Sequence, residues 1–365
     1  MKSICLALAV TFYAATAMSA TTPSDPYAAL TAELDRLAAT EQFAGAALVA
    51  RDGKVVYSQA RGFADRDKKI ANTLDTRFRM GSMNKMFTAV AILQLAQAGK
   101  VGLDAPLGKY LRDYPNAETA KVTLHQLLTH TGGTGDIFGP QFEAHRAALR
   151  ELSDYIAMYG ERAPAYPPGS RYEYSNYGFI LLGRIVEKVS GQGYYDYVSD
   201  HIFKPSGMTE TGSLPENAHV PRLSVPYMGP PSDLQDASET LPYRGTSAGG
   251  GYSTVGDMLK FALALNAHRL LDAKHTELLT TGKVDTSSRD TRYAYGFEDV
   301  RLANGLHRIG HTGGASGMNG VLAIYPDANC VLVVFANRDP PAAMEVGRLQ
   351  VQNVVLPARA VADRQ

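Results

Sequence analysis

Segments with the pattern of β-strands lie near both ends of the chain, and a long run of helix-like segments separates them. Near the N-terminus, residues 43–50 and 54–61 flank Arg51-Asp52-Gly53, where the Asp-Gly step is a strong hairpin signal. Strands at both ends with helices between them indicate an α/β (α+β) fold. We expect one antiparallel sheet built from both termini, flanked by helices, with an inserted and mostly helical subdomain. The expected C-terminal strands are 295–300, 307–310, 320–325 and 331–337.

The helix-like segments have apolar residues at helical spacing, and the clearest of them, residues 84–98, ends at Gly99. Loops rich in Gly, Pro and Ser cover residues 205–252. A cleft between a sheet part and a helical part is the natural place for a functional site. The other expected helices are 25–40, 123–128, 143–159, 178–190, 194–202 and 341–354.

This arrangement predicts one domain over residues 21–365 after a short leader. Its expected parts are a sheet subdomain of about 25–75 plus 290–357 and a helical subdomain of about 80–285.

The first 20 residues have the features of a cleaved signal peptide. Lys2 supplies a positive charge, residues 4–17 are apolar, and small residues follow up to Ala20. The sequence therefore predicts a secreted or periplasmic protein. No later segment is apolar enough to cross a membrane, so we expect no stable membrane insertion. Cleavage removes Cys5 and leaves Cys330, whose apolar surroundings predict a buried structural thiol.

Charge and histidine content exclude several classes of partner. The chain has 36 basic and 36 acidic residues, so its formal net charge of zero gives no reason to expect nucleic acid as a partner. Its nine histidines form no His-Glu-x-x-His pattern. His125 and His130 are five residues apart, on different faces of an expected helix, and we expect packing or capping there and no metal site.

A Ser-x-x-Lys motif, Ser82 to Lys85, opens the expected helix at residues 84–98. Serine and lysine three residues apart share a helix face, and a serine at a helix N-terminus lies where free N–H groups favour negative charge. Apolar neighbours such as Met86 disfavour the ammonium form of Lys85, which helps it to move a proton. One such motif is expected by chance in a chain of 365 residues. Alone it would indicate an ordinary helix start rather than a catalytic site.

Two further short motifs could complete a site. In Tyr174-Ser175-Asn176, a phenolate near a lysine could act as general base and Asn176 could orient the lysine and a substrate carbonyl. A second Tyr-x-Asn, at 114–116, has the composition of a polar turn.

The other motif is His311-Thr312-Gly313-Gly314, which follows the short expected strand at 307–310. Its glycines would let a substrate approach the backbone closely. Alone, it would indicate a strand end with a surface histidine.

Together and in this order, the three motifs resemble those of the penicillin-recognising serine hydrolases. This family includes class C β-lactamases, D-alanyl-D-alanine carboxypeptidases, D-aminopeptidases and related esterases. The resemblance spans about residues 28–340 and implies a β-lactamase/transpeptidase-like fold. Four more segments are similar to family motifs: 99–107, 127–133, 202–208 and 248–253.

The resemblance implies a role for each motif residue. Ser82 would be the nucleophile, Lys85 its partner and Tyr174 the general base, while the N–H groups of Ser82 and Gly314 would form the oxyanion hole. It implies an acyl-enzyme route on a small ester, amide or peptide substrate, with no metal or organic cofactor. The substrate-binding or supporting residues would be Asn176, His311, Thr312 and Gly313.

One position departs from the family pattern. The β-lactamases and carboxypeptidases usually have lysine where this chain has His311, and a neutral imidazole holds a substrate carboxylate less well. This favours a carboxylesterase or a D-amino-acid peptidase. Two alternatives stay open: a β-lactamase or D-alanyl-D-alanine carboxypeptidase acting on cell wall, and a penicillin-binding sensor that acylates without turnover.

A rival nucleophile is Ser247, because Gly245-Thr-Ser247-Ala-Gly249 fits the G-x-S-x-G pattern. That elbow needs an apolar strand before the serine and a helix after it, and neither is expected there. The sequence therefore favours Ser82.

Overall fold

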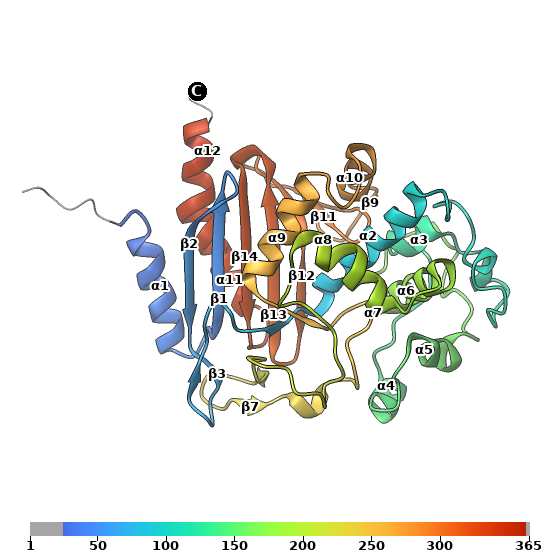
Figure 1. The fold of residues 1–365 in the computed structure, drawn as a ribbon, viewed down its shortest axis with the longest axis horizontal. Coiled ribbons are helices and arrows are strands. Elements are labelled where there is room, and N and C mark those ends of the chain that lie inside the picture. The colour runs from blue at the N-terminus through green and yellow to red at the C-terminus, as the bar shows by residue number, and fades with distance from the viewer. Residues whose placement is uncertain (1–24, 363–365) are drawn as a thin grey trace, which may run out of the picture.

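A computed structural model describes residues 25–362, so the predicted leader and Cys5 lie outside the described residues. An eight-stranded antiparallel sheet forms the centre of the molecule (Figure 1), with the strand order β2-β1-β14-β13-β12-β11-β10-β9. Both ends of the chain contribute to it, because β1 pairs with β14 along its whole length. The strands are β1 Gly45–Arg51, β2 Lys54–Arg61, β9 Val284–Asp285, β10 Thr291–Tyr293, β11 Glu298–Arg301, β12 His307–Ala315, β13 Met318–Tyr325 and β14 Cys330–Ala336.

Both faces of this sheet are covered, which explains why β14 is apolar at every position. Val333 and Phe335 belong to the core on one face of the sheet, whereas Leu332 and Val334 belong to the core on the opposite face. Alternate residues of a strand point to opposite faces, so a strand between two layers has no polar face. Cys330 begins β14 and is a buried free thiol, as predicted.

The N- and C-terminal helices pack on one face, and the remaining helices lie on the other (Figure 1). On the first face are α1 (Ala28–Ala39), α11 (Ala342–Gln350) and α12 (Leu356–Ala362). On the other, α9 (Val255–Asn266) packs on β14 and β1. The remaining helices are α2 Asn84–Gln97, α3 Leu124–Leu128, α4 Pro140–His145, α5 Leu152–Tyr159, α6 Asn176–Ser190, α7 Tyr194–Val198, α8 Lys204–Ser206 and α10 Ala273–Thr280.

The predicted fold class is confirmed, and the local differences have physical causes. The helix expected over 143–159 is two helices, α4 and α5, separated by residues 146–151. Helix α10 was not predicted, although Asp272 caps it by accepting a hydrogen bond from the His275 N–H. Strand β9 belongs to the large sheet, although residues 80–285 were expected to form the helical part. Helix α9 also packs on this sheet, so more of the middle of the chain contributes to the sheet part than expected.

Three two-stranded ribbons complete the structure. The ribbon that matters most for the site is β5 (Phe78–Arg79) paired with β8 (Tyr252–Ser253), because the chain enters the Ser82 turn directly after β5. The other ribbons are β3 (Phe63–Asp65) with β4 (Ile70–Ala71), and β6 (Tyr227–Met228) with β7 (Gln235–Asp236).

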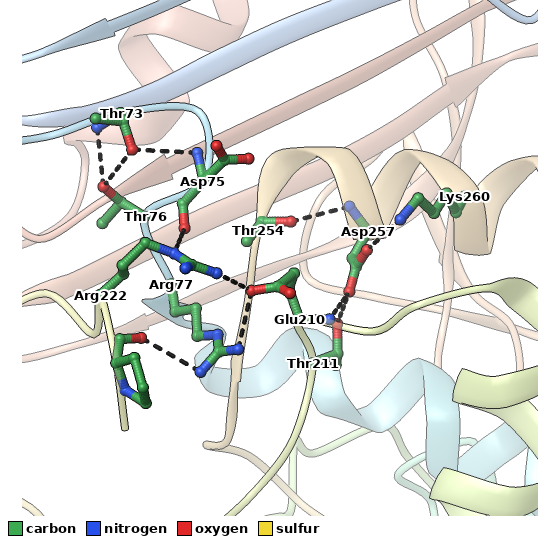
Figure 2. A network of polar contacts seen from close by, with 11 residues as sticks. Thr73, Asp75, Thr76, Arg77, Glu210, Thr211, Arg222, Thr254, Asp257 and Lys260 are labelled. Atoms are coloured by element: carbon green, nitrogen blue, oxygen red, sulfur yellow. Dashed lines mark hydrogen bonds and ion pairs between the residues drawn. The ribbon is translucent and has the colours of Figure 1, made fainter. Parts of the chain in front are cut away.

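A polar network beside this ribbon ties three distant segments together (Figure 2). Asp257 in α9 is buried, accepts hydrogen bonds from the Glu210 N–H (2.7 Å) and the Thr211 hydroxyl (2.9 Å), and pairs with Lys260 (2.8 Å). Glu210 in turn pairs with Arg77, the residue before β5, at 2.9 Å. The network holds the segment after α8 against both α9 and the strand that leads to Ser82.

Within residues 25–362, no helix has the combination of length and apolar content that crossing a bilayer requires.

Candidate active site

Ser82 lies in a single 3-10 turn, η1 (Gly81–Met83), that packs directly on strand β12. Gly81 has a φ of 53°, a left-handed conformation that favours glycine. A Cβ atom on Gly313 would lie 2.0 Å from the Met80 carbonyl oxygen, so only glycine allows β12 to approach this turn. The sequence predicts that the motif glycines let a substrate approach the backbone. In the structure, Gly313 instead lets strand β12 pack against the η1 turn.

This close approach brings the backbones of Ser82 and Gly314 to one cavity. Ser82 and Gly314 both line it, and a Cβ on Gly81 would be 2.9 Å from the Gly314 nitrogen. Two N–H groups at one point are what an oxyanion hole requires. His311 to Gly314 lie within β12 and do not follow it, because the strand continues to Ala315.

Lys85 is completely buried at the start of α2, and each hydrogen-bond partner of its Nζ is an oxygen atom. Its Nζ lies 3.2 Å from Ser82 Oγ, 2.7 Å from Asn176 Oδ1 and 2.5 Å from the Ala248 carbonyl oxygen. Burial lowers the pKa of Lys85 to about 7, and the negative charge of Asp136 partly opposes this. Near neutral pH a large share of Lys85 is therefore an uncharged amine that can accept a proton.

Tyr174 lies beside this lysine, with Lys85 Nζ 4.6 Å from its ring centroid. Burial raises the pKa of Tyr174 far above its usual range, and a hydrogen bond with the Ser82 side chain lowers it only in part. The three residues predicted as catalytic therefore meet in space. These pKa shifts argue against Tyr174 as the general base and favour Lys85 in that role, because burial disfavours a phenolate and favours a neutral amine.

Asn176 is the first residue of α6, and its side chain links Lys85 to a residue that the sequence analysis missed. Ser175 caps the helix by accepting a hydrogen bond from the Gly178 N–H. The Asn176 amide nitrogen Nδ2 donates to Asp136 Oδ2 at 3.1 Å, and the Asn176 backbone N–H donates to Asp136 Oδ1 at 3.3 Å. Asp136 follows the segment 127–133 that carried part of the resemblance, but no spacing rule marked it.

His311 is buried and uncharged, not a surface residue. Its Nδ1 donates to the Thr312 carbonyl oxygen at 2.5 Å, so Nε2 accepts from the Tyr293 hydroxyl at 3.0 Å. Burial lowers the pKa of His311 to about 4. At neutral pH this position therefore supplies no positive charge to a substrate carboxylate.

His130, expected to pack or cap, packs against Tyr174. Its ring centroid lies 4.3 Å from that of Tyr174, and its Nδ1 accepts a hydrogen bond from the Ser175 N–H at 3.1 Å. His125 Nδ1 instead contacts the Tyr295 hydroxyl at 2.7 Å. Within the described residues no three His, Cys, Asp or Glu side chains form a possible metal cluster.

The rival nucleophile Ser247 is completely buried, and its hydroxyl donates to the Phe179 carbonyl oxygen at 2.9 Å. The neighbouring Ala248 supplies the carbonyl oxygen that contacts Lys85, so this segment supports the site through its backbone. The second Tyr-x-Asn is a turn, as predicted, in which Asn116 accepts hydrogen bonds from two following N–H groups.

A cavity of about 480 Å³ opens over Ser82. Its walls are mainly apolar, and most of their apolar residues come from the loop and helix after Asp136 and from the loop before Ser247. None of its lining residues is Lys, Arg or His, and the one carboxylate, Glu143, pairs with Arg146 at 2.8 Å. Asn176 and Gly314 line the cavity, whereas His311, Thr312 and Gly313 are not among its lining residues. The apolar lining residues are Ile137, Phe138, Phe142, Tyr155, Leu241, Pro242 and Met318.

Comparisons with known proteins show which family and which structures this chain is similar to. The model of the Beta-lactamase family matches residues 30–356. A penicillin-binding protein from Bacillus halodurans has a similar structure (TM-score 0.80, 33% identity), covering 87% of this chain and 98% of that one. A D-amino acid amidase from Ochrobactrum anthropi SV3 superposes with a TM-score of 0.77 at 25% identity, covering 94% and 100%. Esterase EstB of Burkholderia gladioli is 31% identical over 215 residues, which are 55% of this chain and 54% of that protein.

Proposed function

The chain belongs to the Beta-lactamase family of serine hydrolases, as its motifs indicated, and we propose that it hydrolyses uncharged esters or amides through an acyl-enzyme on Ser82. The observation that carries this proposal is the contact of the Ser82 hydroxyl with a buried amine at 3.2 Å, beside two backbone N–H groups. A nucleophile, a base and an oxyanion hole are the parts that acyl transfer needs.

In the acylation step, the neutral Lys85 amine takes the Ser82 proton while Ser82 Oγ bonds to the substrate carbonyl carbon. The carbonyl oxygen becomes negative and is held by the N–H groups of Ser82 and Gly314. Loss of one such donor raises a barrier by about 3 kcal/mol. The bond to the leaving group then breaks. The proton returns from Lys85 to the departing atom, with the Tyr174 hydroxyl as relay.

Deacylation reverses these roles with water as the attacking group. Water gives a proton to Lys85 as its oxygen bonds to the acyl carbon, and Ser82 Oγ leaves and is reprotonated. The products are a carboxylic acid and a regenerated enzyme, and the proposal requires no metal or organic cofactor.

The apolar cavity supports a substrate with an apolar group next to the scissile carbonyl. Phe142 and Ile137 present hydrocarbon surface near Ser82, and burial of such surface contributes about 25 cal/mol per Å². With His311 uncharged and no cation in the cavity lining, a substrate carboxylate would be desolvated without a partner. This favours neutral esters and amides over β-lactams and peptides that end in a free carboxylate.

A substrate panel tests the proposal. We expect hydrolysis of p-nitrophenyl acetate and butyrate, loss of that activity in Ser82→Ala, and weak or absent turnover of nitrocefin and of a D-Ala-D-Ala peptide. D-alanyl-p-nitroanilide decides between ester and amide preference. Fast nitrocefin turnover would overturn the substrate class, and permanent labelling by a fluorescent penicillin without ester hydrolysis would identify a sensor.

We also propose that the protein is exported, on the strength of Lys2 and the apolar residues 4–17. N-terminal sequencing of the protein recovered from periplasm or medium should begin between residues 18 and 21. An intact Met1 on a protein retained in the cytoplasm would contradict this.

A further inference from the structure

The carboxylate of Asp136 determines which end of the Asn176 amide faces Lys85. An ionised carboxylate only accepts hydrogen bonds, so the Asn176 group that contacts Asp136 Oδ2 at 3.1 Å must be the donor, Nδ2. The other end of the amide, the acceptor Oδ1, is then directed at Lys85 Nζ, 2.7 Å away. Asp136 is itself fixed, because its Oδ1 accepts from the Ile137 N–H at 2.7 Å.

The direction of the Asn176 amide matters because of the geometry at Lys85. A neutral amine has two N–H bonds and one lone pair. Asn176 Oδ1 and the Ala248 carbonyl oxygen are both acceptors, so together they use the two N–H bonds. The third direction leads to Ser82 Oγ at 3.2 Å, and the lone pair occupies it.

If the amide were reversed, its NH₂ group would face Lys85 and would take the lone pair. An N–H of the amine would then point at Ser82 Oγ, and Lys85 could not accept the serine proton. The hydrogen bond between Asn176 and Asp136 therefore decides whether the lone pair of Lys85 is directed at Ser82.

We propose that Asp136 is a positioning residue for the hydrolytic reaction, which acts through Asn176 to direct the Lys85 lone pair at Ser82. The inference rests on the proposed function, since it concerns the base of that reaction. It deepens that function by adding a residue that touches neither the nucleophile nor its base.

The surrounding charges are consistent with this role. Of the groups that face Lys85 from other elements, His130 and His311 have pKa values held well below the ordinary range by burial, and Tyr174 has one held far above it. Lys85 is thus the member of this cluster that changes charge near neutral pH.

Two carboxylates act on the cluster electrostatically. Asp136 raises the pKa of Lys85 against the effect of burial, and Glu298 on β11 acts on His311 and Tyr174. Of these two, Asp136 is the one that both orients Asn176 and changes the basicity of Lys85.

The test compares Asp136→Asn with the exchange variant Asp136→Asn/Asn176→Asp, using p-nitrophenyl butyrate from pH 5 to 9. Asp136→Asn no longer fixes the amide, so kcat should fall about 10- to 100-fold, the cost of a misdirected group, with KM within about twofold. The acidic limb of the pH profile should move to lower pH, because a negative charge that stabilised the ammonium form is gone.

The exchange variant keeps the charge and the hydrogen bonds but reverses their places. A carboxylate at position 176 gives Lys85 an acceptor again, and the amide at position 136 can donate to it. We expect kcat at pH 9 to recover at least tenfold relative to Asp136→Asn, and the acidic limb to move above that of wild type, because the carboxylate now contacts the lysine.

Glu161→Gln, which neutralises an exposed carboxylate after α5, is the matched control and should behave as wild type. Wild-type kcat and an unmoved limb in Asp136→Asn would overturn the role of Asp136, as would an exchange variant no better than Asp136→Asn. If Asp136→Asn does not fold, the exchange variant alone decides, because the acidic limb of its pH profile should lie at higher pH than that of wild type. Failure of the proposed function is distinct, since it would show as Ser82→Ala retaining wild-type hydrolysis.

Discussion

Lys85 is a lysine with no exposed surface, and the three hydrogen-bond partners of its Nζ are uncharged oxygen atoms. Moving an ammonium ion into such a site costs several kcal/mol, whereas a neutral amine pays far less. The nearest compensating charge is the carboxylate of Asp136, one residue further away behind Asn176. The balance of these effects leaves Lys85 with a pKa of about 7.

This balance predicts the pH dependence of the reaction. Because the active form is the neutral amine, kcat/KM for a neutral ester should rise with pH through a limb near 7 and reach a plateau above it. His311, with a pKa of about 4, should contribute nothing in this range. Stopped assays from pH 5 to 9 measure this. A profile that falls between pH 6 and 8 would show that the ammonium form is the active one.

At the scale of elements, the site depends on how closely a strand approaches a turn. The chain brings η1 against β12 through Gly81 and Gly313, and the β5–β8 ribbon holds the start of η1. The proposed oxyanion hole therefore depends on two backbones in contact and not on any side chain.

Gly313→Ala tests this contact. Its new Cβ would lie 2.0 Å from the Met80 carbonyl oxygen and 3.1 Å from the Ser82 nitrogen, so strand and turn must separate. We expect kcat/KM for p-nitrophenyl butyrate to fall about 100-fold, the cost of displacing one oxyanion donor. The control is Gly256→Ala in α9, where the nearest atom to the added Cβ is 3.8 Å away. Equal activity in the two variants would contradict the account.

Some elements could be predicted from sequence and others could not. The β1–β2 hairpin was marked by Asp52-Gly53, and α2 by its apolar spacing and by Gly99. Helix α10 was missed because it buries little besides Leu279 and so has a weak apolar stripe. The sequence predicts a strand that stops at Gly310, because glycines usually weaken strands. In the structure β12 continues to Ala315, and Gly313 is required by the neighbouring turn.

At the scale of the whole molecule, the site joins segments that are far apart in sequence. Ser82 and Lys85 come from α2 and its preceding turn, Tyr174 and Asn176 from the start of α6, and Gly314 from β12. The order of the three motifs made this meeting predictable. The role of Asp136 was not predictable, because its importance lies in what it contacts and not in any spacing along the chain.

The network of Figure 2 should stabilise the whole assembly rather than the chemistry. Asp257→Ala would leave the Glu210 N–H and the Thr211 hydroxyl without their acceptor. We expect it to lower the free energy of unfolding by about 2–4 kcal/mol, since hydrogen bonds to a buried charge contribute about 1.5–3 kcal/mol each. Urea denaturation measures this. Asp285→Ala, which removes an exposed partner of Arg292, is the control and should change little, and equal losses in both would contradict the role of the network.

Peptide mass spectrometry shows directly whether Ser82 carries the acyl group. Trypsin separates the two candidate nucleophiles, because Ser82 falls in the peptide Met80–Lys85 and Ser247 in the peptide Gly245–Lys260. After reaction with a fluorophosphonate, we expect the added mass on Met80–Lys85, no added mass in Ser82→Ala, and unchanged labelling in Ser247→Ala. Label on Gly245–Lys260, or undiminished labelling of Ser82→Ala, would rule out Ser82 as the nucleophile.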